Sequence, residues 1–180
     1  KLDPDRVRSI AEGARAVAGI EDPIDQELEG HRLENGLELR KVRRPLGTVC
    51  IVYEGRPNVT IDAAVICLKS GNVAVLRGSS AASRSNAVLA SIAAEAVAAT
   101  GLPSASVTLI GGGNREELEV LGTADGLLDL IIPRGGEGLK KALEAVATVP
   151  VIFAAGGNCH ICVDATADLD MAAAITLNAK

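Results

Sequence analysis

The sequence predicts an α/β fold, an open parallel sheet with helices on both faces and a β-hairpin that projects from it. From residue 46 onward, short apolar runs alternate with helical patterns, which is typical of parallel strands joined by right-handed crossovers. Hydrophobic residues make up 48% of the chain but aromatic residues only 1%, so small aliphatic side chains must build the core. The chain has 180 residues, enough to bury such a core.

The segment before the sheet is expected to form a helix, a linker and a hairpin. Asp3 can cap a helix that has Pro4 at its first position, and the helical pattern extends to about Ala18. An acidic linker follows at residues 21–29. Asn35-Gly36 then separates two alternating segments, which is a strong hairpin signal.

The alternation after residue 45 assigns the remaining elements in turn. Strands are expected at residues 46–53, 72–76, 106–110 and 127–132, with short strands at 149–153 and 161–163. Helices are expected at residues 60–70, 83–100, 115–121, 137–147 and 168–180. The helix at residues 83–100 shows little amphipathic contrast, so we expect it to be well covered. The chain thus divides into a helix and linker (1–29), a hairpin that can act as an oligomerisation arm (30–44) and a sheet domain (45–180).

Composition and charge argue against several classes of function. A net charge of −5 gives no positive field to attract polyanions, and the near absence of aromatic residues removes the stacking platforms used to bind single-stranded nucleic acid. The longest apolar stretch, residues 87–99, is too short to span a membrane. Four cysteines suggest a reduced, cytoplasmic protein. Lys1 in place of Met, and a helical pattern that still runs at Lys180, suggest a piece of a longer chain.

Three loops at predicted strand ends carry candidate functional residues, because ligands bind at the carboxyl ends of strands in open α/β sheets. The first loop, residues 53–58, places a carboxylate, a guanidinium and an amide together, from Glu54, Arg56 and Asn58. An equally good interpretation is a plain turn in which Pro57 sets the backbone and Arg56 pairs with Glu54.

The second loop has the residue types of a phosphate cradle. Arg77 supplies a guanidinium, Gly78 an unhindered backbone, and Ser79 and Ser80 two hydroxyls, directly before a predicted helix. The alternative is a flexible loop in which Ser83 is an ordinary helix cap.

The third loop also joins a strand to a helix. Pro133 and Arg134 precede Gly135 and Gly136, and the two glycines allow a pyrophosphate to approach the backbone closely while Arg134 neutralises it. The alternative is a glycine-rich turn with no ligand.

Two other motifs invite assignments that the residues do not support. Residues 111–114 follow a predicted strand like a dinucleotide fingerprint, but Glu116 stands where the third glycine is required, so we interpret them as a tight turn. In Cys159-His160-Ile161-Cys162, the two thiols would face opposite sides of a strand, and His31 is the only other histidine. We therefore expect neither a zinc site nor a redox pair there.

Taken together, several segments resemble the gamma-glutamyl phosphate reductase (glutamate-5-semialdehyde dehydrogenase) family of the aldehyde dehydrogenase superfamily. The matching segments run in order along nearly the whole chain: YEGRPNVT (53–60), CLKSGN (67–72), RGSS (77–80), IPRGG (132–136), TVPVI (148–152) and NAK (178–180). As a set they are highly specific, although each alone is weak.

The resemblance implies NADPH-dependent reduction of L-glutamyl 5-phosphate to L-glutamate 5-semialdehyde with release of phosphate, a step of proline biosynthesis. In that family a cysteine thiolate displaces phosphate and a hydride then releases the aldehyde. The nucleophilic cysteine is expected beyond Lys180, so this chain would be the NADP-binding part and inactive by itself. The family also implies a cytoplasmic homo-oligomer that can associate with glutamate 5-kinase.

The resemblance also assigns roles to individual residues. Arg77 falls where related enzymes carry a lysine beside the adenosine ribose, and Ser80 where NAD-preferring relatives carry a glutamate. A cation with no opposing carboxylate would leave room for a 2′-phosphate, which favours NADP. Arg134, Gly135 and Gly136 match the loop over the pyrophosphate.

Arg56 and Asn58 match a loop that faces the reacting acyl group in the family. Arg56 would hold the acyl phosphate or the substrate carboxylate, and Asn58 would polarise the carbonyl. The activating glutamate of the superfamily, expected near Ala154, is missing. Two alternatives stay open: a truncated, non-catalytic nucleotide-binding paralogue, or another member of the superfamily that uses NAD.

Overall fold

The computed structural model describes residues 2–111, 114–153 and 160–179. The helices are α1 (Pro4–Ala18), α2 (Asn58–Lys69), α3 (Ser83–Ala99), α4 (Arg115–Gly122), α5 (Glu137–Glu144) and α6 (Leu169–Asn178). The strands are β1 (Glu27–Arg32), β2 (Glu38–Val42), β3 (Thr48–Tyr53), β4 (Val73–Arg77), β5 (Val107–Leu109) and β6 (Leu130–Arg134). The predicted alternation of strands and helices is confirmed.

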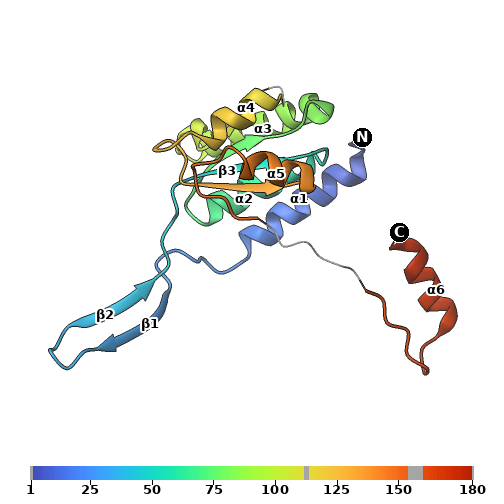
Figure 1. Cartoon of the computed structure of the whole chain (residues 1–180), viewed down its shortest axis with the longest axis horizontal. Coiled ribbons are helices and arrows are strands. Elements are labelled where there is room, and N and C mark those ends of the chain that lie inside the picture. The colour runs from blue at the N-terminus through green and yellow to red at the C-terminus, as the bar shows by residue number, and fades with distance from the viewer. Residues whose placement is uncertain (1, 112–113, 154–159, 180) are drawn as a thin grey trace.

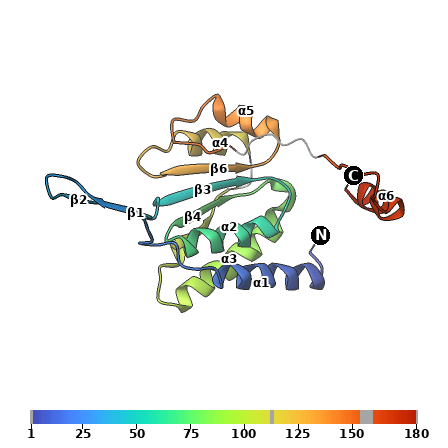
Figure 2. The ribbon, with the colours of Figure 1, turned by 90° about the horizontal axis from the view of Figure 1, so that it is seen from below.

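Four parallel strands form the central sheet in the order β5-β4-β3-β6; Figure 2 labels three of them, β4, β3 and β6, in this order. The chain runs outward from β3 through β4 to β5, then returns to place β6 on the other side of β3. In the register of the sheet, Cys50 lies between Val75 and Ile131. The direction of winding therefore reverses between β3 and β6, and such a reversal opens a crevice at the carboxyl ends of the two strands.

Helices cover both faces of this sheet because side chains of its strands alternate between two apolar cores. Val49, Ile51 and Tyr53 of β3 pack in the core under α2 and α3. Cys50 and Val52 pack in the opposite core, under α4 and α5. Figure 2 shows the two helical layers on either side of the sheet. The prediction of a core built from small aliphatic residues is confirmed, with Tyr53 as its one large aromatic member.

Helix α1 forms an outer layer on α2 (Figure 2). Its start agrees with the sequence prediction: the Asp3 side chain accepts a hydrogen bond of 2.9 Å from the Arg6 N–H, and Pro4 occupies the first turn. No described helix is both long and apolar enough to cross a membrane.

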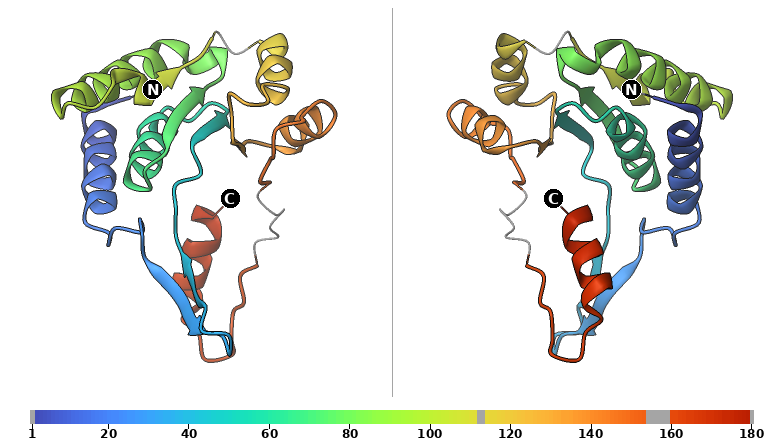
Figure 3. Two further views of the ribbon diagram at one scale, coloured as in Figure 1. Left: turned by 90° about the vertical axis from the view of Figure 1, so that its left-hand side faces the viewer. Right: turned by 90° about the vertical axis from the view of Figure 1, so that its right-hand side faces the viewer.

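Strands β1 and β2 form a separate antiparallel hairpin that projects from the body of the molecule (Figures 1 and 3). Gly36 in its turn has φ +88°, a conformation that glycine adopts without strain. Every residue of both strands is exposed. The projecting hairpin is thus confirmed, although β1 begins at Glu27, inside the segment predicted as a linker.

Two local expectations are wrong, one on the cover of α3 and one on the last two short strands. Helix α3 is covered on one side only, since Val88 and Ile92 are 61% and 54% exposed. Because the helix is rich in alanine, its sequence does not indicate which side faces the core. Residues 149–153 form a single bridge, between Ile131 and Val151, and residues 161–163 belong to no strand. The helix predicted at residues 168–180 is confirmed as α6, which stands apart from the sheet (Figure 1) and has no buried residue.

Candidate functional site

A cleft of about 560 Å³ opens at the carboxyl ends of β3 and β6, where the sheet reverses its winding. It joins the first and third predicted loops, which are far apart in the sequence. The cleft is lined by Tyr53, Glu54, Gly55, Arg56, Asn58, Val59, Asp62, Pro133, Arg134 and Gly135. The structure therefore brings together the carboxylate, guanidinium and amide of one loop with the proline, guanidinium and glycine of the other.

The loop after β3 presents Arg56 and Asn58 to this cleft. Both are exposed. Asn58 is the first residue of α2, and its Nδ2 donates a hydrogen bond of 2.9 Å to Asp62 Oδ2 one turn later. The amide keeps a second N–H group for another acceptor. Among the described ion pairs, none joins the side chains of Arg56 and Glu54, so the plain-turn interpretation lacks its expected contact.

Glu54 instead reaches across to the start of α5. The backbone N–H of Gly136 donates to Glu54 Oε2 at 3.3 Å. A side chain at position 135 would meet Glu54 Cδ and Leu139 Cδ2 at 2.8 Å, so only glycine lets the carboxylate lie this close. Helix N-termini favour anions, and here a carboxylate of the protein occupies part of that position.

The second predicted loop follows β4, and its cation has a partner that the sequence did not reveal. Arg77 is 8% exposed, its Nη2 donates to the carbonyl of Asn114, and its Nε lies 3.7 Å from Glu117 Oε2. The expectation that no carboxylate opposes Arg77 is therefore wrong. Glu117 comes from α4, and nothing in the spacing of the sequence indicates that α4 reaches the end of β4.

Two buried polar atoms of this loop have no hydrogen-bond partner. They are Arg77 Nε and Ser79 Oγ, and they are the only buried side-chain atoms in this state within the described residues. Buried polar groups are normally satisfied, so this loop is a candidate ligand site. Ser80 is exposed and begins a short 3-10 turn before α3. Ser83 is the first residue of α3 and not its cap, contrary to the alternative interpretation.

A buried polar network lies below the loops and was missed in the sequence. The hydroxyl groups of Tyr53 and Thr60 are hydrogen-bonded at 2.7 Å, and Thr60 Oγ1 donates to Asn86 Oδ1 at 3.3 Å. All three residues are at most 1% exposed. A side chain on Gly78 would meet Asn86 Nδ2 and Tyr53 Cε2, so the phosphate-type loop rests directly on this network. The available signal was polar residues at core positions of two apolar helices.

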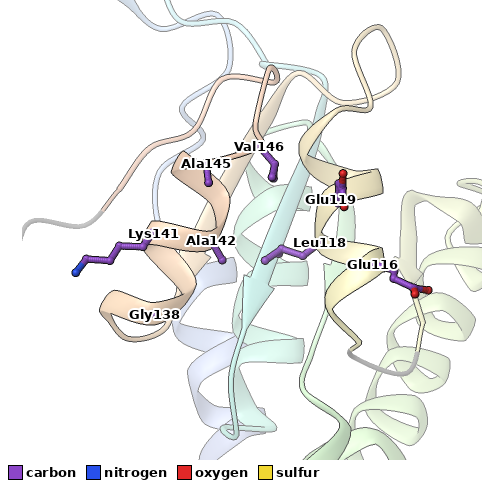
Figure 4. Close-up of a pocket in the computed structure, with 8 residues that line it drawn as sticks. All are labelled: Glu116, Leu118, Glu119, Gly138, Lys141, Ala142, Ala145 and Val146. Carbon is purple, nitrogen blue, oxygen red and sulfur yellow. The ribbon is translucent and has the colours of Figure 1, made fainter.

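A second concavity of about 540 Å³ lies between α4 and α5 (Figure 4). Its floor is apolar, while charged side chains stand at its rim. The lining residues are Glu116, Leu118, Glu119, Gly138, Lys141, Ala142, Ala145 and Val146. We refer to it as the α4–α5 groove. It was not predicted, although the small residues of α5 were a usable signal.

The described cysteines are poor nucleophiles or lie away from the cleft. Burial raises the pKa of the Cys50 thiol to about 12 and that of Cys67 to about 11, so both stay protonated near neutral pH. Cys162 is exposed, and Cys159 lies outside the described residues, as does Ala154. Over residues 2–111, 114–153 and 160–179, no group of three metal-ligating side chains comes together.

The residues of the predicted tight turn are only partly described, since Gly112 and Gly113 lie outside the described ranges. Gly111 has φ +64°, and the Glu117 carboxylate occupies the space where its side chain would be. Asn114 caps α4 by accepting a hydrogen bond of 2.8 Å from the Glu117 N–H. This segment therefore starts a helix and positions the partner of Arg77.

An open parallel sheet with a cleft at its winding reversal is the arrangement in which α/β proteins bind their ligands. Residues 4–180 match the sequence profile of the aldehyde dehydrogenase family, and the chain belongs to that family.

Within the family, the chain is most usefully compared with gamma-glutamyl phosphate reductases. That of Thermobifida fusca is 48% identical over 99% of this chain and 43% of its own length, and that of Kineococcus radiotolerans is 50% identical over 100% and 42%. The crystal structure of the Thermotoga maritima reductase superposes with a TM-score of 0.85 and 39% identity over 99% of this chain and 43% of its own length. The chain thus spans less than half the length of these relatives.

Proposed function

We propose that this chain is the cofactor-binding part of a gamma-glutamyl phosphate reductase, which reduces L-glutamyl 5-phosphate to L-glutamate 5-semialdehyde in proline biosynthesis. The names of its relatives support the reaction. The observation that carries the proposal is the cleft between β3 and β6, because it brings a substrate-type loop and a pyrophosphate-type loop together. We also propose a cytoplasmic location, in keeping with a chain that has four cysteines.

The described residues fit a nicotinamide dinucleotide that supplies a hydride when bound. The α4–α5 groove would hold the flat adenine on its apolar floor. Arg77 and Ser79, which have unsatisfied buried atoms, would hold the ribose end, with Gly78 and Ser80 shaping the loop. Gly135 and Gly136 at the start of α5 would hold the pyrophosphate, beside Pro133 and Arg134. We propose NADPH as the cofactor, since Arg77 can pair with a 2′-phosphate.

The cleft would receive the reacting end of the substrate. Arg56 would bind the acyl phosphate or the carboxylate, and Asn58 would donate its second amide N–H to the reacting carbonyl. The thiolate that displaces phosphate, forming a C–S bond as the C–O bond breaks, is proposed to lie beyond Lys180. The raised pKa values of Cys50 and Cys67 argue against either buried thiol in this role.

Two measurements on the 180-residue chain test this function. NADPH titration, followed by the fluorescence of the reduced nicotinamide, should show saturable binding, and Arg134→Ala should weaken it. Incubation with NADPH and L-glutamyl 5-phosphate should give no semialdehyde. Turnover by the chain alone would overturn the assignment of the nucleophile, whereas an absence of NADPH binding would overturn the proposed cofactor site.

A second candidate is a non-catalytic nucleotide-binding module that assembles through the hairpin. The supporting observation is that β1 and β2 expose apolar side chains, with Leu28 and Leu39 46% and 48% exposed on strands with free edges. The same hairpin would serve a homo-oligomeric reductase, which can also associate with glutamate 5-kinase. The coding sequence after Lys180 discriminates, since a cysteine within roughly ten codons is expected only for the reductase.

A further inference from the structure

We propose that Glu117 determines how strongly this protein prefers NADPH to NADH, because it competes with the 2′-phosphate for Arg77. The inference rests on the proposed cofactor site. It goes beyond that site because it assigns the choice between the two cofactors to a residue of α4 that was not among the proposed cofactor-binding residues.

The geometry places Glu117 and Arg77 in a shared, largely enclosed position. Their side chains are 19% and 10% exposed, and Arg77 Nε lies 3.7 Å from Glu117 Oε2. The carboxylate fits over Gly111, where any side chain would collide with it. One edge of the guanidinium is held by the Asn114 carbonyl. The cation therefore has one carboxylate beside it before any nucleotide arrives.

The Nε atom of Arg77 nevertheless has no hydrogen-bond partner, because 3.7 Å is too long for a well-formed hydrogen bond. Ser79 Oγ, two residues along the chain, is also buried without a partner. The three terminal oxygens of a phosphate monoester can accept hydrogen bonds from both groups at once, whereas a ribose hydroxyl offers a single oxygen. Two donors of this loop therefore lack an acceptor, and a phosphate would supply one to each, which Glu117 does not do.

The charge of the 2′-phosphate makes the competition for Arg77 affect NADPH and not NADH. A phosphate monoester carries about −1.5 to −2 charges at neutral pH, so it is attracted by Arg77 and repelled by Glu117. NADH has an uncharged hydroxyl in place of the 2′-phosphate, so the attraction by Arg77 and the repulsion by Glu117 are both much weaker for it. Removing the charge of Glu117 should therefore strengthen binding of NADPH by roughly tenfold and leave NADH nearly unchanged.

Glu117→Gln is a suitable variant because it alters charge with little change in shape. Glu117 is the third residue of α4, and its backbone N–H is capped by Asn114; a glutamine there keeps this cap. The matched control is Glu95→Gln, which removes one charge from the exposed side of α3, where Glu95 contacts Ser91. Circular dichroism and thermal unfolding confirm that each variant is folded.

The experiment measures the dissociation constants of NADPH and NADH for the unmodified chain, Glu117→Gln, Glu95→Gln and Arg77→Gln. The expected result is a gain of roughly tenfold for NADPH alone in Glu117→Gln, no change of the NADPH-to-NADH ratio in Glu95→Gln, and loss of any NADPH preference in Arg77→Gln. In the double variant Arg77→Gln/Glu117→Gln the gain should disappear.

The outcomes distinguish a failure of the selectivity role of Glu117 from a failure of the proposed cofactor site. If NADPH and NADH bind but Glu117→Gln changes both equally, or neither, the selectivity role is overturned while the cofactor site stands. If the gain persists without Arg77, competition for that guanidinium is wrong. If no variant binds either nucleotide, the proposed cofactor site itself fails, and the inference fails with it.

Discussion

Tyr53, Thr60 and Asn86 show how single residues hold the candidate site in place. Their side chains come from β3, α2 and α3, and they form one hydrogen-bonded network at most 1% exposed. Because Asn86 and Tyr53 of this network lie directly under Gly78, they set how closely the loop after Arg77 packs on the core. Sequence reasoning located the loops but not this support, since hydrogen bonds between side chains so distant in sequence leave no local pattern.

Thr60→Val tests the network without changing the size of the side chain much. The variant leaves the Tyr53 hydroxyl and Asn86 Oδ1 without their partner in a buried position, so the free energy of unfolding should fall by about 1–3 kcal/mol. Urea denaturation measures this change.

The control for this variant is Thr176→Val. Thr176 is exposed on α6, where its hydroxyl bonds only to the carbonyl of Ala172, and its loss should change the unfolding free energy by less than about 0.5 kcal/mol. Equal changes of the unfolding free energy in the two variants would show that the buried Thr60 network stabilises the fold no more than a single exposed hydrogen bond does.

Arg77 illustrates what residue-level prediction lacked. Its position at the end of β4 is confirmed, but its supposed freedom from carboxylates is not. The pairing with Glu117 depends on where α4 begins relative to β4, a relationship fixed by packing across the sheet. Composition and spacing contain no information on that contact.

At the scale of elements, α5 is where the sequence prediction and the structure agree most usefully. Both place Gly135 and Gly136 between β6 and the helix, and the structure adds that Gly135 lines the cleft. The occupation of that N-terminus by Glu54 was not predicted. A pyrophosphate bound there would have to displace the carboxylate, because two anions compete for one N–H group.

Glu54→Gln tests this competition. A neutral amide holds the Gly136 N–H less strongly, so NADPH and NADH should both bind roughly two- to fivefold more tightly, by the same factor. Calorimetric titration with each nucleotide measures the change. Glu144→Gln, at the other end of α5, is the control and should leave both affinities unchanged.

The hairpin is a second element that can be tested by itself. Residues 30–40 contribute to neither core, so replacing them by Asn-Gly, which joins the paired residues Glu29 and Lys41, should leave the unfolding free energy within about 1 kcal/mol. If the hairpin mediates assembly, the same variant should shift the molar mass from oligomer to monomer in light scattering. An unchanged oligomer would exclude the hairpin as the contact.

At the scale of the whole molecule, the sequence predicted the class of sheet but not its strand order. Alternating strands and helices require parallel crossovers, which explains the success. The placement of β6 beside β3, instead of beyond β5, creates the cleft, and it is decided by packing of α4 and α5 on the far face. The exposed side of α3 and the isolated α6 could not be predicted either, because apolar composition alone does not say which surface is covered.

Both cores contain a buried thiol, so global stability should depend on pH in the alkaline range. Folding raises the pKa of Cys50 and Cys67 from 9.0 to about 12 and about 11, and it also raises that of Tyr53. Above pH 9 the unfolded chain loses these protons while the folded chain keeps them. The unfolding free energy should therefore fall as pH rises, by about 1 kcal/mol for each thiol at pH 10.

Urea denaturation at pH 7.5, 9 and 10 (conditions spanning the ordinary cysteine pKa) measures this slope. Cys50→Ala/Cys67→Ala should be less stable at neutral pH but should show a shallower decline. Parallel declines in the variant and the unmodified chain would assign the slope to other groups.

Tyr53 has a consequence for how this molecule can be observed. It is the only tyrosine in a chain without tryptophan, and its buried side chain bonds to Thr60 and lies beneath Gly78. Nearly all intrinsic ultraviolet emission must therefore arise from a ring buried beneath the Gly78 loop. The protein thus carries a natural fluorophore next to that loop, so changes at the loop can be followed without attaching a dye.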